Sequence, residues 1–397
     1  MAKSVPVLVS GSILEWARDT AGYSVGEAAA KLSTTEVKLL SWEKDTAKPS
    51  IAKVRNMAKV YRRPLDQLFR TTKPIEPQVP HDFRRSQADG ARRYLPQLRF
   101  QVRAAFQRRQ LALELAGSLD LPIRDFDLRA KLNDDPEIVG SKIRHALGVS
   151  FESQRNLRQK NYNFWRSKIE KLDVLVFQVS TLPKSEMLGL ALSFGQLPVI
   201  GVNRKLALNG RVFTLLHEFV HLMLETNGVC DLSEDYLSAP NGQKIEIFAN
   251  RVAAAALLPK DILLAEPIVL ARGVGLHDWS DNELNAISAI FGTSEETVLR
   301  RLLTLNRTSA DYYAKRRAIY QARYEQADSL AKQKSEDVEF KRNMPQEVIA
   351  DYGRYFAYLV LASYHQDRIT LSDASNFLGV KAPVVEKVEK KLAARAS

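Results

Sequence analysis

Two histidines and a glutamate near the middle of the chain have the spacing of a metal site. The stretch FTLLHEFVHLML (residues 213–224) contains His217, Glu218 and His221. Residues four apart share one face of a helix, so both imidazoles can bind the same metal ion. Glu218 then lies beside the ion, where its carboxylate can take a proton from a water molecule. This H-E-x-x-H pattern therefore indicates zinc-dependent hydrolysis.

The residues around the motif favour a metal over a purely structural role. The other side chains of the stretch are mostly large and uncharged, which predicts a helix that is buried nearly all round. Buried histidines beside a buried carboxylate are unfavourable unless a partner satisfies them. A metal ion would do so. The alternative is a helix whose histidines are satisfied by hydrogen bonds alone.

A zinc ion that keeps one position for water needs a third protein ligand. The acidic candidates after the motif are Glu225, Glu234, Asp235 and Glu246. Glu246 is favoured because its predicted helix face is lined with alanines, and a carboxylate on such a buried face requires a partner. One turn on, Asn250 is predicted to support a histidine ligand through a hydrogen bond. The alternative for Glu246 is a buried ion pair with an arginine such as Arg251.

The motif and the segment after it resemble the ImmA/IrrE family of zinc peptidases. The resemblance lies in FTLLHEFVHL, in E-x-x-A-N-x-x-A-A-x-x-L-L-P over Glu246–Pro259, and in FGTSEETVLRRLLTL further along. It implies a gluzincin-like zinc endopeptidase with one zinc ion per chain. It also implies a protein substrate, such as a repressor-type regulator, in stress response or mobile-element regulation.

In the expected mechanism, His217, His221 and Glu246 bind a zinc ion that carries a water molecule. Glu218 removes the proton of this water and later delivers it to the leaving amine, while zinc polarises the scissile carbonyl. A side chain that stabilises the developing oxyanion is expected, and Tyr236 is the candidate. An edge strand of the predicted sheet could bind an extended substrate segment.

The elements that hold these residues follow from hydrophobic periodicity and capping residues. The motif is predicted on a helix over residues 211–225, capped by Asn209 and followed by Gly228. Glu246 is predicted on a helix over residues 244–258. Other long helices are expected at residues 94–117, 135–147 and 161–171. Three apolar runs, 174–180, 188–194 and 198–203, predict a small sheet, which the short connections make antiparallel.

Residues 12–69 predict five short helices that resemble the Cro/repressor-type (XRE) helix-turn-helix family. The matching residues are Gly22, Tyr23, Ser24, Ala29, Leu32, Trp42, Glu43, Pro49, Ser50 and Ala58. Lys38 and Ser41, on the predicted recognition helix, are the candidate DNA contacts. Val25 stands where the family usually has glutamine, and Glu36 places an acid near the phosphates. The module is therefore expected to bind either DNA or a protein.

Positive charge is concentrated after this module. The net charge is +12 and the pI about 9.6, which favours an acidic partner such as nucleic acid. Residues 83–110 hold eight arginines and one acid. Their candidate nucleic-acid contacts are Arg84, Arg85, Arg92 and Arg93. The alternative is a solvated helix face with ion pairs inside its own domain.

The sequence predicts an α+β, mainly helical chain of four parts. These are a helix-turn-helix domain (1–72), an arginine-rich helical connecting region (73–160), a zincin-like core (161–265) and a helical C-terminal domain (266–397). A helix-turn-helix-like hairpin is expected at Ile369–Leu392. A single cysteine, no export signal and no apolar run of about 20 residues predict a cytoplasmic protein that does not span a membrane. The alternative function is a DNA-binding regulator or antitoxin-like protein whose zincin fold is structural or inactive.

Overall fold

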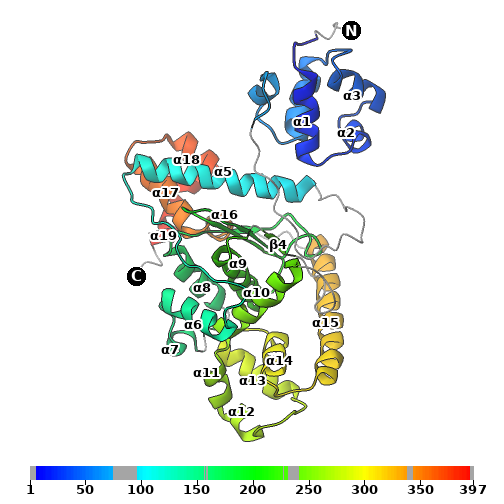
Figure 1. Cartoon of the computed structure of the whole chain (residues 1–397). Helices are drawn as coiled ribbons and strands as arrows, with labels where there is room; N and C mark the ends of the chain where they lie inside the picture. The colour runs from blue at the N-terminus through cyan, green and yellow to red at the C-terminus, as the bar shows by residue number, and fades with distance from the viewer. Residues whose placement is uncertain are drawn as a thin grey trace. The chain divides into compact units, whose positions relative to one another are not determined.

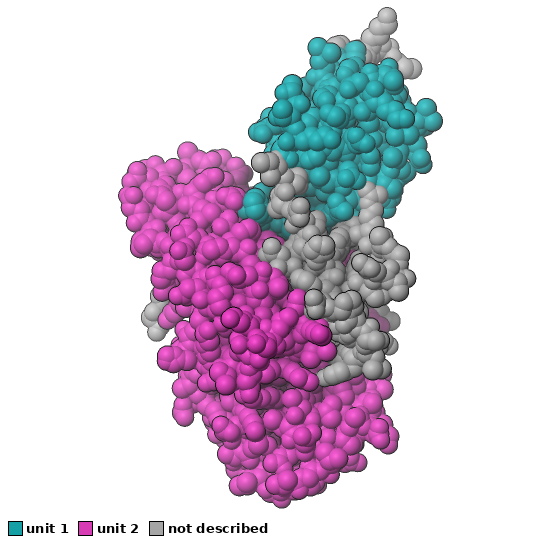
Figure 2. Space-filling view, in the orientation of Figure 1, with its two compact units in different colours: residues 1–79, 87–108 teal, residues 80–86, 109–397 magenta. Residues whose placement is uncertain are grey.

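The computed structural model describes residues 6–74, 96–155, 157, 160–226, 228–230, 241–337 and 343–393 of the 397. The chain forms two compact units, coloured separately in Figure 2: residues 1–79 with 87–108, and residues 80–86 with 109–397. Most described residues are helical and one small sheet is present, so the predicted α+β, mainly helical class is confirmed. Among the described helices, none is long and apolar enough to cross a membrane.

The first unit begins with short helices that lie close to their predicted positions. They are α1 (Gly11–Ala21), α2 (Val25–Lys31), α3 (Glu36–Glu43), α4 (Ile51–Val60) and the 3-10 helix η1 (Leu65–Phe69). Hydroxyl caps start three of them, since the side chains of Ser24, Thr35 and Ser50 each accept a backbone N–H. Gly22, with φ 85°, ends α1. Local capping therefore sets these boundaries.

Long and short helices fill the rest of the chain (Figure 1). Before the sheet come α5 (Pro96–Ser118), α6 (Pro136–Ala146), α7 (Phe151–Gln154) and α8 (Asn161–Glu170). The middle holds α9 (Leu208–Met223), α10 (Asn241–Leu257), α11 (Lys260–Ala265), α12 (Pro267–Arg272), α13 (Asp281–Phe291) and α14 (Glu295–Thr304). The last are α15 (Ala310–Asp337), α16 (Met344–Tyr352), α17 (Arg354–His365), α18 (Leu371–Phe377) and α19 (Ala382–Ala393).

The sheet is mixed, and the prediction of an antiparallel sheet is wrong for one pair of strands. Its strands are β1 (Leu175–Val179), β2 (Gly189–Leu192), β3 (Val199–Asn203) and β4 (Gly228–Cys230), in the order β1-β3-β2-β4. β2 pairs antiparallel with β3 and β4, but β1 pairs parallel with β3. Residues 180–188 connect β1 to β2, and β2 lies on the side of β3 opposite to β1. The amide of Asn203 holds this connection by donating to the carbonyls of Leu182 (3.2 Å) and Met187 (2.7 Å).

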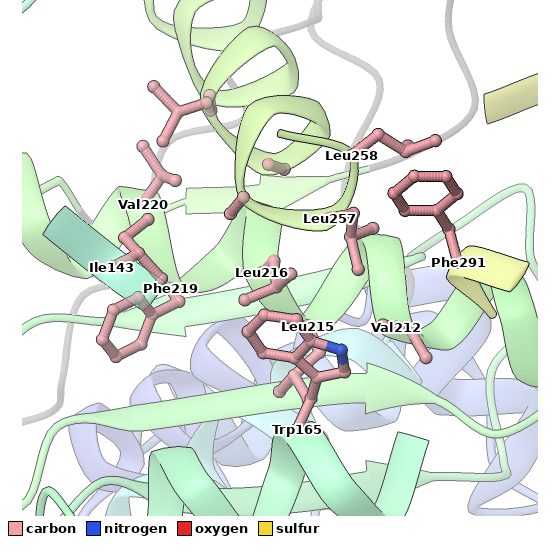
Figure 3. Close-up of a cluster of buried hydrophobic side chains, with 14 of the residues drawn as sticks. Ile143, Trp165, Val212, Leu215, Leu216, Phe219, Val220, Leu257, Leu258 and Phe291 are labelled. Atoms are coloured by element: carbon pink, nitrogen blue, oxygen red, sulfur yellow. The ribbon is translucent and has the colours of Figure 1, made fainter. Parts of the chain in front are cut away.

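Every residue of β1, β2 and β3 is buried, because helices cover both faces of the sheet. In Figure 1, α9 and α16 lie on opposite faces. One face contributes Val176, Ala191 and Ile200 to the core that includes α9, and the other places Phe177 against Phe356 of α17, with ring centroids 6.0 Å apart. The α9 side of this core is drawn in Figure 3, where Leu215, Leu216 and Trp165 gather with residues of α6 and α10.

A buried arginine ties the C-terminal helices to the edge strand β1. Arg166 of α8 donates to the carboxylate of Glu170 (3.0 Å), to the carbonyl of Ala350 in α16 (2.7 Å) and to that of Val176. Burial raises the pKa of the Glu170 carboxyl, although Arg166 opposes this shift. The network fixes α8 and α16 to β1 at this edge of the sheet.

Candidate metal centre

The H-E-x-x-H motif lies on α9, which is buried as its sequence predicts. His217 is 2% exposed, and Glu218 and His221 are both fully buried. The predicted cap is wrong, however. The helix starts three residues earlier than predicted, after Ala207, so Asn209 lies inside its first turn. There the Asn209 amide donates to the carbonyl of Thr293 (2.8 Å), which links α9 to the turn between α13 and α14 rather than capping α9 itself.

Glu246 of α10 meets both histidines. Its carboxylate oxygens lie 3.2 Å from the Nε2 atom of His217 and 3.2 Å from that of His221. The two Nε2 atoms are 3.1 Å apart, and Glu246 is 5% exposed. The three residues form a group that could hold a metal ion, with all ligand atoms within 4.8 Å of one another.

These distances fit a tetrahedral zinc site. Ligands about 2.0–2.1 Å from zinc in a tetrahedral arrangement are separated from one another by about 3.3 Å. The edges of the triangle formed by His217, His221 and Glu246 are 3.1, 3.2 and 3.2 Å long. Two imidazoles and one carboxylate are also the donor set of zinc sites that keep a fourth position for water. The residues present therefore fit a catalytic rather than a closed structural zinc site.

Glu218 packs against a glycine of the sheet. A methyl group built at Gly189, on the α9-facing side of β2, would lie 2.1 Å from one carboxylate oxygen of Glu218 and 2.6 Å from its carboxyl carbon. Any side chain at residue 189 would therefore collide with the Glu218 carboxylate. A glycine inside a strand often marks such a close approach, and the run LGLALSF carries this signal, which the sequence interpretation missed.

The helix that presents Glu246 is held at its C-terminal end by three side chains. The last carbonyls of a helix lack partners within the helix and need donors from elsewhere. The carbonyls of Ala256, Leu257 and Leu258 accept hydrogen bonds of 2.9 Å each. Their donors come from α6, α7 and α14 and are Arg144, Gln154 and Arg301. This arrangement prevents α10 from sliding along its axis. It therefore fixes the position of Glu246 relative to the two histidines of α9.

Arg301 is itself buried and anchored, which strengthens this arrangement. Its guanidinium is 1% exposed and donates to both carboxylate oxygens of Glu137, at 2.7 and 2.6 Å. A two-point contact of this kind restricts the orientation of the guanidinium as well as its position. α6 also packs closely on α10, since a methyl group at Gly140 would lie 2.8 Å from the side chain of Ala255.

A threonine that the sequence interpretation missed contacts one histidine. The Oγ1 atom of Thr226 lies 3.0 Å from Nδ1 of His221. The sequence prediction had instead named Asn250 as the residue that supports a histidine ligand. Asn250 is half-buried. Within the described residues, no hydrogen bond joins the Asn250 amide to His217 or His221. The spacing of five residues between histidine and threonine, across the end of a helix, is the signal that could have identified Thr226.

The structure separates the other candidate ligands from the site or does not describe them. Glu225 is exposed and forms an ion pair with Arg129 (2.9 Å). Arg251, the alternative partner of Glu246, is exposed. Glu234, Asp235 and the candidate oxyanion stabiliser Tyr236 lie outside the described residues.

The candidate nucleic-acid contacts are not part of this centre. Lys38 is exposed on α3, with its amine 6.0 Å from the ring centroid of Trp42, and the hydroxyl of Ser41 donates to the carbonyl of Lys38. Arg84, Arg85, Arg92 and Arg93 lie outside the described residues. Two other arginines of this region each donate to a carbonyl within their own unit. Arg103 donates to Tyr61 in the first unit, and Arg109 donates to Gln196 in the second.

Two histidines and a glutamate converge from neighbouring helices, and the buried Glu218 follows His217 directly on α9; together they define a candidate metallohydrolase centre. Residues 170–303 match the model of a peptidase family described as the IrrE N-terminal-like domain. The matched range contains all four site residues, and the match supports a metallopeptidase-type function for this part of the chain. No curated protein and no solved structure matches the chain.

Proposed function

We propose that the chain is a zinc-dependent endopeptidase that cleaves a protein regulator. The observation that carries this proposal is the buried triangle of ligand atoms from His217, His221 and Glu246, with Glu218 beside it. A bound zinc ion would supply Lewis acidity toward a peptide carbonyl and make a water molecule acidic enough to lose a proton near neutral pH. The match to a peptidase family supports the same reaction class.

In this proposal Glu218 carries the proton. Its carboxylate accepts the proton of the attacking water and delivers it to the leaving amine, as a general base and then a general acid. Gly189 supports this role because the missing side chain leaves room for the Glu218 carboxylate beside β2. β4 is an edge strand of the sheet in the described residues and lies next to β2. An extended substrate segment could therefore pair with β4 near Glu218.

Gly189→Ala is expected to lower kcat by about 100-fold, because a displacement of a catalytic group by about 1 Å has an effect of this size. The new methyl group must displace the Glu218 carboxylate, while the three metal ligands keep their places. Peptide-cleavage kinetics together with metal analysis of the purified variant would measure both effects.

Gly195→Ala is the matched control, since a methyl group at residue 195 meets no atom within 4 Å. Wild-type kcat in Gly189→Ala would show that the close approach of β2 does not position Glu218.

The substrate class comes from the family resemblance, which suggests repressor-type regulators in stress response or mobile-element control. We propose that the first unit is a Cro/repressor-type helix-turn-helix module that recruits DNA or a protein partner. The succession of α2, a turn at residues 32–35 and α3 supports this. Glu36 and Val37 are both exposed at the start of α3, so this helix is not uniformly basic.

One experiment tests the peptidase proposal directly. The purified chain is expected to contain one zinc ion per chain and to generate new N-termini from a proteome-derived peptide library. Treatment with a chelator should abolish the new termini, and added zinc should restore them. A zinc-loaded, folded chain that cleaves nothing in the library or in extracts of its own cells would contradict the proposal.

A further inference from the structure

α9 ends in a Schellman motif that includes a metal ligand. Leu224 is the C-cap, and Glu225 follows with φ 55°, in the left-handed region. The backbone N–H of Thr226 donates to the carbonyl of His221 (3.0 Å), and that of Glu225 donates to Leu222 (3.1 Å). These are the two hydrogen bonds of the motif, and they bring the side chains of its first and last positions together. Those positions are His221 and Thr226.

In such motifs this side-chain pair is frequently apolar. Here it is a hydrogen bond, with Thr226 Oγ1 lying 3.0 Å from Nδ1 of His221. The same hydroxyl donates to the backbone carbonyl of His221 at 3.2 Å. A hydroxyl has one proton to give. We assign that proton to the carbonyl, which can only accept; Oγ1 then accepts a hydrogen bond from the ring, and Nδ1 carries the hydrogen.

A neutral imidazole with its hydrogen on Nδ1 has its lone pair on Nε2. In His221 this is the nitrogen that faces the centre, 3.1 Å from Nε2 of His217 and 3.2 Å from the Glu246 carboxylate. We propose that Thr226 is a positioning residue of the metal centre, which selects the metal-binding tautomer of His221 and fixes the plane of its ring. This inference rests on the proposed function, since it concerns the same metal site.

Thr226 also joins the ligand helix to the strand that faces Glu218. Its carbonyl accepts a hydrogen bond from the hydroxyl of Ser193 (3.3 Å), which directly follows β2. Thr226 therefore links the end of α9 to the residue after β2. Its side chain contacts His221, and its backbone carbonyl accepts from Ser193. Gly189, at the other end of β2, contacts Glu218. Thr226 thus helps to fix the position of the ligand His221 relative to the proposed base Glu218.

The test compares zinc affinity, measured by competition with a chromogenic chelator, in the full-length wild type and its Thr226 variants. Thr226→Val keeps the shape of the side chain but removes the acceptor, and we expect it to weaken zinc binding about 10–100-fold, the usual effect of losing a ligand's hydrogen-bond partner. Thr226→Ser restores the hydroxyl and is expected to recover most of the affinity. The absorption spectrum of the cobalt(II)-loaded protein should change with valine and return with serine.

Thr304→Val is the matched control, because the Thr304 hydroxyl also donates to a helix carbonyl, that of Arg300 (3.0 Å), on α14. It should leave zinc affinity and the cobalt spectrum unchanged. Wild-type affinity and spectrum in a folded Thr226→Val variant would overturn the inference while leaving the proposed function intact. A folded wild-type protein that binds no zinc would instead overturn the proposed function and, with it, this inference.

Discussion

Replacing Glu218 with glutamine is expected to lower peptide cleavage by about 10²–10⁴-fold, the range that general acid–base groups contribute. Glutamine has nearly the shape of glutamate but cannot accept the proton of the attacking water. The three metal ligands are untouched by this change, so zinc content should stay at the wild-type value. Comparison of cellular proteins with wild type and with Glu218→Gln would then show the natural substrate as a protein lost only with wild type.

Glu225→Gln is a suitable control for this substitution. Glu225 lies two turns further along the chain from Glu218 but is exposed and paired with Arg129. The Glu225→Gln variant should cleave at the wild-type rate, since ion pairs of exposed residues contribute little to the stability of the fold. The mechanism is falsified if Glu218→Gln cleaves a substrate as fast as the wild type while holding zinc.

Glu246→Ala is expected to lose zinc and, with it, all zinc-dependent cleavage. Loss of a direct ligand should weaken binding by more than the about 10–100-fold that loss of a ligand's hydrogen-bond partner causes. Zinc binding also stabilises the folded chain, by about 2.7 kcal/mol when free zinc is 100 times Kd. The wild type should therefore unfold at a higher temperature with zinc than without it, and Glu246→Ala should show little or no such rise.

The appropriate comparison is Glu266→Gln. Glu266 is 5% exposed, as is Glu246, and its carboxylate pairs with Arg155 (3.3 Å). Its replacement should leave the zinc-induced rise in unfolding temperature intact. An equal rise in wild type and Glu246→Ala would mean that zinc binds elsewhere, and that the buried triangle is a structural hydrogen-bonded cluster.

Helices could be located from the sequence because their ends are set by neighbouring residues. Ser24 and Ser50 cap α2 and α4, and Gly22 ends α1, as their residue types indicate. The first residues of α9 show the limit of this reasoning. Asn209 has the right residue type for a cap, yet its amide bonds to Thr293, a partner 84 residues away. Tertiary contacts of that kind leave no trace in the local pattern.

The pairing of the strands could not be read from periodicity. Alternation or apolar content identifies a strand, but the order of strands depends on the path of the connections. The parallel pairing of β1 with β3 follows from residues 180–188 and from the Asn203 amide that holds them. β4 contains only Gly228–Cys230, too short for a pattern to reveal.

The residues predicted as ligands converge, because helical spacing alone brings His217 and His221 together and an alanine-lined face points to Glu246. Their supports were harder to find. Gly189 has no functional group, so its importance follows only from the side chain that lies over it. Thr226 lies beyond the helix, where the geometry of the chain reversal decides which residues it contacts. Chemical groups are visible in a sequence, whereas the space and orientation they require are not.

The side chains that fix the end of α10 set a lower limit on the size of a fragment that can form the metal centre. Arg144 and Gln154 precede both residue 161, where the zincin-like core was expected to begin, and residue 170, where the family match begins. Arg301 comes from the opposite direction along the chain. A shortened protein intended for crystallography or inhibitor screening should therefore include α6 through α14. During synthesis, the contacts that hold the end of α10 are complete only after α14 has left the ribosome.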